Sequence, residues 1–178
     1  MTEKILRVLD RVYLACIWIS GISIMLMSLI IPWGIYARYV LGSGSSWPEP
    51  VAVMLMVTFT FFGAAATYRA GGHIAVGILT DRLPESLQWF CAKLVDVLMM
   101  VVCLFVMFWG YKLSMEMMRQ GLAELPGLPV GYTYLPLPIG SLLTLIFVLE
   151  NTFFGSQSRR DVVTFDHESE PTPAQALT

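Results

Sequence analysis

The charged residues that could take part in chemistry lie in or beside long apolar runs. Lys93 and Asp96 are three residues apart, which places both on one face of a helix, where they can pair. This spacing predicts either a structural ion pair near the membrane surface or a site for a coupling ion. The position of Lys93 near the start of its helix favours the structural pair.

Arg38 and Glu49 flank a short Gly/Ser turn. We expect them to pair across it and close a helical hairpin, although Glu49 could instead cap the positive end of its helix.

The residue types that catalysis or cofactor binding requires are scarce. The two histidines, His73 and His167, lie outside the predicted spans, whereas a bis-histidine haem site in a membrane needs paired histidines within helices. The three cysteines are widely spaced in apolar runs, as is typical of packed thiols. The sequence has no phosphate-binding glycine loop, zinc-ligand spacing or catalytic-triad motif. We therefore expect no enzymatic activity and no cofactor, and the lack of a basic aromatic patch predicts no nucleic-acid partner.

Composition indicates an integral membrane protein. Of the 178 residues, 56% are hydrophobic and 13% are charged, and the mean hydropathy is +0.68. Soluble domains carry about 25% charged residues. The apolar run 50–68 is close to the roughly 20 residues that a bilayer-spanning helix needs. The charge-free stretch between Arg11 and Arg38 is longer than the apolar core of a signal peptide, about 7–15 residues, so we expect a retained transmembrane helix there.

The predicted fold is an all-α integral membrane protein with four transmembrane helices, spanning about 12–39, 50–69, 86–112 and 135–154. Together with their loops they form one membrane domain over residues 1–154. Apolar residues at helical spacing predict a short interfacial amphipathic helix at about 73–83. Residues 155–178 are polar and without periodicity, which predicts a disordered cytoplasmic tail. Glu150 and Asn151 lie at the end of the fourth span, where we expect an interfacial rather than a buried position.

Basic residues near the ends of the spans predict that both termini are cytoplasmic, because cytoplasmic ends carry an excess of Lys and Arg. Only three basic residues fall on the opposite side: Arg38, Lys112 and Arg119. The side that holds the termini carries Lys4, Arg7, Arg11, Arg69, Arg82, Lys93, Arg159 and Arg160.

Gly63 and Thr67 place small residues four apart on the second span, so that a partner helix could approach closely at Gly63.

The order of several short motifs resembles the small, DctQ-like membrane subunit of tripartite ATP-independent periplasmic (TRAP) transporters. The resemblance covers roughly residues 10–154. The family often has a second acid where this chain has Pro50, and an acid after the His-Ile pair where this chain has Gly77. No role for those acids is carried over. The motifs that carry the resemblance are Arg38-Tyr39, Trp47-x-Glu49, Arg69-x-x-x-His73-Ile74-x-Val76 and Leu128-Pro129 with Tyr134-Leu-Pro-Leu-Pro138-Ile-Gly140.

The resemblance implies a multi-pass protein of the bacterial inner membrane. Its partners would be membrane lipid, a large TRAP membrane subunit and a periplasmic substrate-binding protein. In such a system the large subunit imports an organic acid with the sodium gradient, and the small subunit scaffolds it. Arg38, Trp47, Glu49, Gly63, Arg69, His73, Lys93 and Asp96 are then candidates for structural or partner contacts. The alternative is an independent four-helix transporter acting as a homodimer, with Asp96 as its proton-coupled site. The membrane anchor of a redox enzyme is disfavoured by the lack of paired histidines in the spans.

Overall fold

The computed structural model describes residues 2–43, 46–71, 85–122 and 127–154, and the regular elements in these ranges are all helices. They are α1 (Thr2–Tyr39), α2 (Pro48–Arg69), α4 (Glu85–Met117), α5 (Gly131–Tyr134) and α6 (Pro136–Phe154). Four helical segments are long and apolar enough to cross a membrane: Leu6–Tyr39, Pro48–Arg69, Lys93–Met117 and Gly131–Thr152. The predicted all-α fold with four spans is confirmed.

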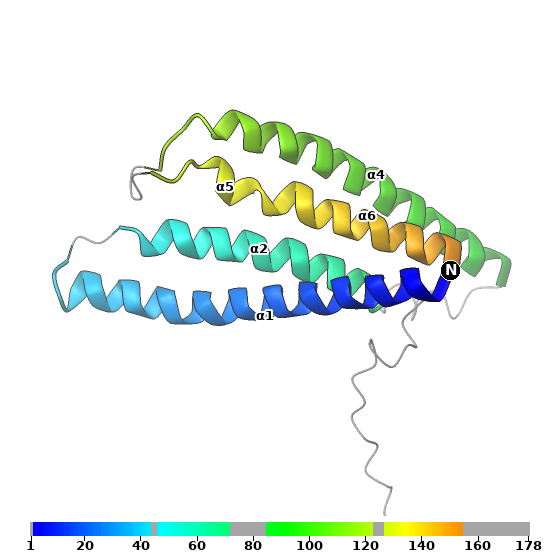
Figure 1. Cartoon of the computed structure of the whole chain (residues 1–178), viewed down its shortest axis with the longest axis horizontal. Coiled ribbons are helices and arrows are strands. Elements are labelled where there is room, and N and C mark those ends of the chain that lie inside the picture. The colour runs from blue at the N-terminus through cyan, green and yellow to red at the C-terminus, as the bar shows by residue number, and fades with distance from the viewer. Residues whose placement is uncertain (1, 44–45, 72–84, 123–126, 155–178) are drawn as a thin grey trace, which may run out of the picture.

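The helices lie side by side in the order α1, α2, α6, α4 (Figure 1). The long helices in contact are α1 with α2, α2 with α6, and α6 with α4. The described parts of α1 and α6 make no backbone contact of comparable closeness. The arrangement is therefore an open layer rather than a closed bundle. Because α1 and α4 lie at its two edges, much of their apolar surface is exposed, as in Trp18, Leu29, Leu98 and Phe105.

Helix α1 begins at Thr2 and so includes the basic segment that we expected to precede the span near Val12. Arg7 and Arg11 lie on its exposed face, whereas Asp10 and Tyr13 are buried against the neighbouring helices. The charged residues of this first part of α1 are either exposed or paired within the protein, so the helix continues through them. The predicted interfacial helix at 73–83 and the tail at 155–178 lie outside the described residues.

Sequence features explain where the helices start and where they pack closely. Helix α2 has Pro48 and Glu49 in its first turn, where a missing N–H costs nothing and an acid faces the positive helix end. Gly140 of α6 lies against Phe61 of α2: a Cβ added at Gly140 would be 2.6 Å from the Phe61 Cβ and 3.0 Å from its carbonyl carbon. The absence of a side chain at Gly140 therefore sets the close α2–α6 contact.

The apolar core lies where α1, α2 and α6 meet, towards the end of the layer that carries the N-terminus. Met99 and Met100 of α4 pack against this core from the other side. The core therefore receives side chains from all four long helices. Its buried members are Tyr13, Cys16, Ala65, Ala66, Tyr68, Phe147 and Val148.

Candidate functional site

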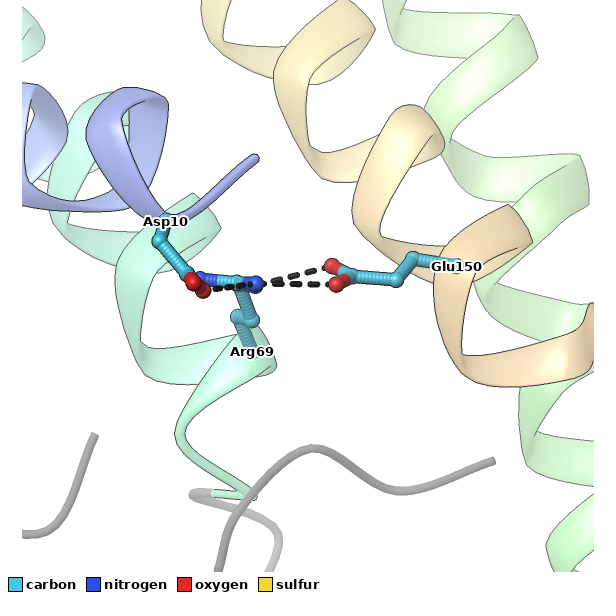
Figure 2. A network of polar contacts seen from close by, with 3 residues as sticks. All are labelled: Asp10, Arg69 and Glu150. Carbon is cyan, nitrogen blue, oxygen red and sulfur yellow. Dashed lines mark hydrogen bonds and ion pairs between the residues drawn. The ribbon is translucent and has the colours of Figure 1, made fainter. Parts of the chain in front are cut away.

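Arg69, the last residue of α2, is buried between two acids from other helices (Figure 2). Its Nε and Nη2 donate to the two carboxylate oxygens of Glu150 on α6, each over 2.8 Å. Nη2 also donates to Oδ1 of Asp10 on α1 over 2.7 Å. The side chain of Arg69 is only 1% exposed. This geometry corrects the expectation that Glu150 is interfacial, because Glu150 is buried and paired.

Two aromatic rings cover the Arg69 guanidinium. The Tyr13 ring centroid is 5.3 Å from the Arg69 Cζ, and the Phe147 centroid is 5.4 Å from it. Such positions allow a cation–π attraction, which is strongest where water is excluded. We call Asp10, Arg69 and Glu150 the buried triad. Its three side chains carry one positive and two negative charges. Nη1 of Arg69 makes no hydrogen bond in the part of the chain that the structure describes.

A second polar group adjoins the triad along the chain, since Tyr68 precedes Arg69 and Asn151 follows Glu150. The Tyr68 hydroxyl and the Asn151 amide each donate to Oδ1 of Asp96 over 3.1 Å. The Lys93 ammonium lies 3.8 Å from Oδ2 of Asp96, so these two residues pair as their spacing allows. Asp96 is buried, whereas 43% of the Lys93 side chain is exposed. Among the described residues Asp96 thus has three polar partners, two on other helices and one on its own helix.

Together these residues join all four long helices at one end of the layer. Arg69 connects α2 with α1 and α6, and Asp96 of α4 is held by α2 and α6. We call this group the inner polar cluster; its members are Asp10, Tyr68, Arg69, Lys93, Asp96, Glu150 and Asn151. Hydrogen-bonded charges in a low-dielectric interior hold a fixed geometry, because separating them would strand a charge. The cluster is suited to fixing the helices in place.

The described residues include no group of three or more His, Cys, Asp or Glu side chains that could hold a metal ion. The carboxylates of the inner polar cluster bind a guanidinium, a hydroxyl, an amide and an ammonium group. The arrangement is that of a structural ion network.

The other candidate residues lie away from the cluster. Arg38 Nη2 donates to Oε1 of Glu49 over 2.9 Å, which gives the expected contact across the α1–α2 turn. Trp47, just before α2, is partly buried. A Cβ at Gly63 would lie 3.1 Å from the Ser20 Oγ, so the helix that approaches Gly63 closely is α1 of the same chain. His73 lies outside the described residues.

Sequence reasoning missed Asp10, Tyr68 and the burial of Glu150. A signal for Asp10 was present, because it lies three residues before Tyr13 and therefore on the same face of the helix start. Glu150 is the only acid in the fourth span. An ionisable residue at such a position faces other helices and pairs more often than it faces lipid. Both observations indicate acids that face other helices, but neither identifies Arg69 as their partner.

Comparison with known proteins assigns the chain to a family. Residues 27–157 match the family model for the DctQ component of tripartite ATP-independent periplasmic transporters. A TRAP transporter small permease protein of Haemophilus influenzae is 30% identical over 137 residues, which cover 75% of this chain and 84% of the relative. The sialic acid TRAP transporter small permease of Vibrio cholerae is 23% identical over 126 residues, covering 70% of this chain and 71% of that protein. The ectoine TRAP transporter small permease of Halomonas elongata is 23% identical over 127 residues, 71% of this chain and 66% of that one.

The region matched by the family model contains every member of the inner polar cluster except Asp10, which precedes it. The family model and the relatives agree on one assignment, and the four spans fit it. The chain therefore belongs to the DctQ family of TRAP transporter small permease subunits, and it is a multi-pass protein of the inner membrane and a transporter component rather than an enzyme.

Proposed function

We propose that this small permease subunit is a static scaffold for the large membrane subunit, in sodium-coupled uptake of an organic acid delivered by a periplasmic binding protein. The observation that carries the scaffold role is the buried contact of Arg69 with Asp10 and Glu150. A subunit that moved its helices against one another during transport would have to break these contacts. Breaking a buried pair costs several kcal/mol, about 3–5 in measured cases.

The use of polar groups within the spans also favours a scaffold. Asp96, the residue on which an independent proton-coupled transporter would depend, already binds Tyr68, Asn151 and Lys93. A coupling site would instead offer carboxylates to a cavity reached by the ion. The contacts of Asp96 support a structural role, and we expect the sodium and substrate sites in the large subunit.

The open layer leaves wide apolar faces on which a second membrane subunit could pack. Helix α1 contacts only α2 among the described helices, and many of its large apolar side chains are exposed. Packing and polar contacts, rather than escape from water, drive association in lipid. The names of the relatives give sialic acid and ectoine as transported compounds of those systems. For this chain we propose only the wider class of organic acids.

Reconstitution tests this function directly. Vesicles should contain the large subunit with this chain, the large subunit alone, or this chain alone, each with the binding protein and an imposed sodium gradient. We expect uptake only when both membrane subunits are present, and no substrate binding by this chain alone. Gradient-driven uptake by this chain without a second membrane subunit would refute the scaffold role. Uptake by the large subunit alone at the full rate would refute it as well.

A further inference from the structure

Side chains of α1 and α2 line a groove beside Arg38 and Glu49. These two residues lie at the end of the layer where α1 leads into α2, opposite the N-terminus, and Figure 1 shows the two helices there. The volume of the groove is about 300 Å³. The walls are apolar side chains of both helices, with Ile35 and Val53 about half exposed. The other lining residues are Ile31, Gly34, Arg38, Tyr39, Pro48, Glu49 and Ala52.

The rim of the groove carries the Arg38–Glu49 ion pair. The two side chains are 49% and 72% exposed, so the pair faces outward although its charges are only 2.9 Å apart. A guanidinium has five N–H donors and a carboxylate has about four acceptor positions. Each member can therefore bind a further charged group while the pair stays intact. The rim offers one cationic and one anionic site side by side.

The position of Arg38 and Glu49 at the ends of their spans places this pair of charged sites at the level of lipid headgroups. Arg38 is in the last turn of α1 and Glu49 is in the first turn of α2, so both flank the apolar lengths of the two spans. Tyr39, which also lines the groove, is 80% exposed, and tyrosines at span ends lie among headgroups. Below the rim only apolar side chains continue along the groove. A polar rim above an apolar channel matches a phospholipid in its normal orientation.

We propose that this groove binds a phospholipid with a zwitterionic phosphoethanolamine headgroup. The lipid phosphate binds the Arg38 guanidinium, the primary ammonium donates to the Glu49 carboxylate, and the start of an acyl chain lies against Ile35 and Val53. Charge complementarity selects this headgroup. An anionic phosphoglycerol headgroup offers no cation to Glu49. A phosphocholine headgroup carries its positive charge on a quaternary nitrogen without N–H groups, so it cannot donate a hydrogen bond to Glu49.

Native mass spectrometry of the full chain tests the proposal. The protein is exposed to equal amounts of phosphatidylethanolamine, phosphatidylcholine and phosphatidylglycerol with matched acyl chains, and the retained lipid is counted. We expect the unaltered chain to retain phosphatidylethanolamine about threefold to fivefold over the other two, as the loss of one exposed opposite-charge contact predicts. Equal retention of the three lipids would overturn the proposal and leave the groove to a helix of another protein.

Three variants test the ammonium, phosphate and acyl-chain contacts one at a time. Glu49→Gln should remove the preference for phosphatidylethanolamine over phosphatidylcholine, whereas Arg38→Gln should weaken retention of both. Ala52→Phe fills the groove and should reduce retention of every lipid. The matched control is Glu3→Gln in the exposed Glu3–Arg7 pair at the other end of α1, which should change nothing. An unchanged preference in Glu49→Gln would also overturn the proposal. Circular dichroism measures the helical content of each variant and identifies one that has failed to fold. The lipid competition on the unaltered chain tests the proposal without any variant.

Discussion

Arg69 and Glu150 form a two-pronged ion pair although they lie 81 positions apart in the sequence. Nε and Nη2 of the guanidinium each donate to a different carboxylate oxygen over 2.8 Å. This geometry is specific to arginine, because an ammonium cannot present two parallel N–H groups. The pair fixes the end of α2 against the end of α6, and Asp10 adds α1 to the same contact.

Arg69→Met should destabilise the folded protein severely, because it leaves two carboxylates buried without their cation. Losses of about 3–5 kcal/mol are typical for breaking a buried pair. The thermal midpoint of the purified protein and the level of assembled protein in the membrane measure the effect. Arg38→Gln is the matched control, because exposed ion pairs are worth about 0–1 kcal/mol.

A triple variant distinguishes a charge effect from a packing effect. In Asp10→Leu, Arg69→Met, Glu150→Leu no charge of the triad remains, and replacing a buried ion network by apolar residues is often neutral. We therefore expect the triple variant to be more stable than Arg69→Met alone. If the triple variant is the less stable of the two, the triad does not act through its charges.

The prediction of the fold from sequence succeeded where the signal is local. The apolar run of α2, with prolines at its start and Gly71 after its end, defines a span without any knowledge of its neighbours. The Arg38–Glu49 contact was also predictable, because a short turn brings the two residues together. The extension of α1 to Thr2 was not predicted, because the charged residues before Val12 interrupt the apolar run that indicates a span.

The site could be predicted only in part, because its contacts join distant parts of the chain. The Lys93–Asp96 pair follows from a spacing of three residues, but the stronger contacts of Asp96 come from Tyr68 and Asn151. Nothing in the sequence around Arg69 identifies Asp10 and Glu150 as its partners. Those pairings depend on the order of the helices in the layer, which hydrophobic periodicity does not determine.

Asp96→Ala should lower the level of assembled protein much more than Lys93→Ala. Removing Asp96 leaves the Tyr68 hydroxyl and the Asn151 amide without this acceptor, whereas the partly exposed Lys93 can reach water or headgroups. Fluorescence-detected size exclusion of the two variants measures the difference. Normal assembly of Asp96→Ala combined with lost ion dependence of uptake would instead support a coupling role for Asp96.

Gly140→Ala should weaken the α2–α6 contact, because the new methyl group would collide with Phe61, including its backbone carbonyl carbon. The free energy of unfolding should fall by an amount typical of overpacking, about 1–3 kcal/mol, and the thermal midpoint should fall with it. Gly21→Ala is the matched control, since a Cβ there meets no atom within 4 Å. Alanine has the higher helix propensity, so Gly21→Ala should leave the midpoint unchanged or raise it. Equal effects of the two variants would contradict the close packing at Gly140.

The direction of the helices and the distribution of basic residues together predict the membrane orientation. The helices α1, α2, α4 and α6 alternate in direction, so that the start of α1 and the end of α6 lie at the same end of the layer (Figure 1). Both ends of the membrane domain are therefore on one side of the membrane. The excess of basic residues predicted for that end leads us to expect it in the cytoplasm, because Lys and Arg near span ends are retained there.

Reporter fusions measure the orientation at three positions. We expect fusions at Thr2 and Ser156 to report cytoplasm and a fusion at Gly44 to report periplasm. The inverse pattern at all three positions would leave the four-span fold intact and refute only the assignment from basic residues. Opposite sides for Thr2 and Ser156 would mean that one helix does not cross the membrane. The short turn at Tyr134–Pro136, where α5 meets α6, would then be the first place to look, because the fourth span depends on continuity across it.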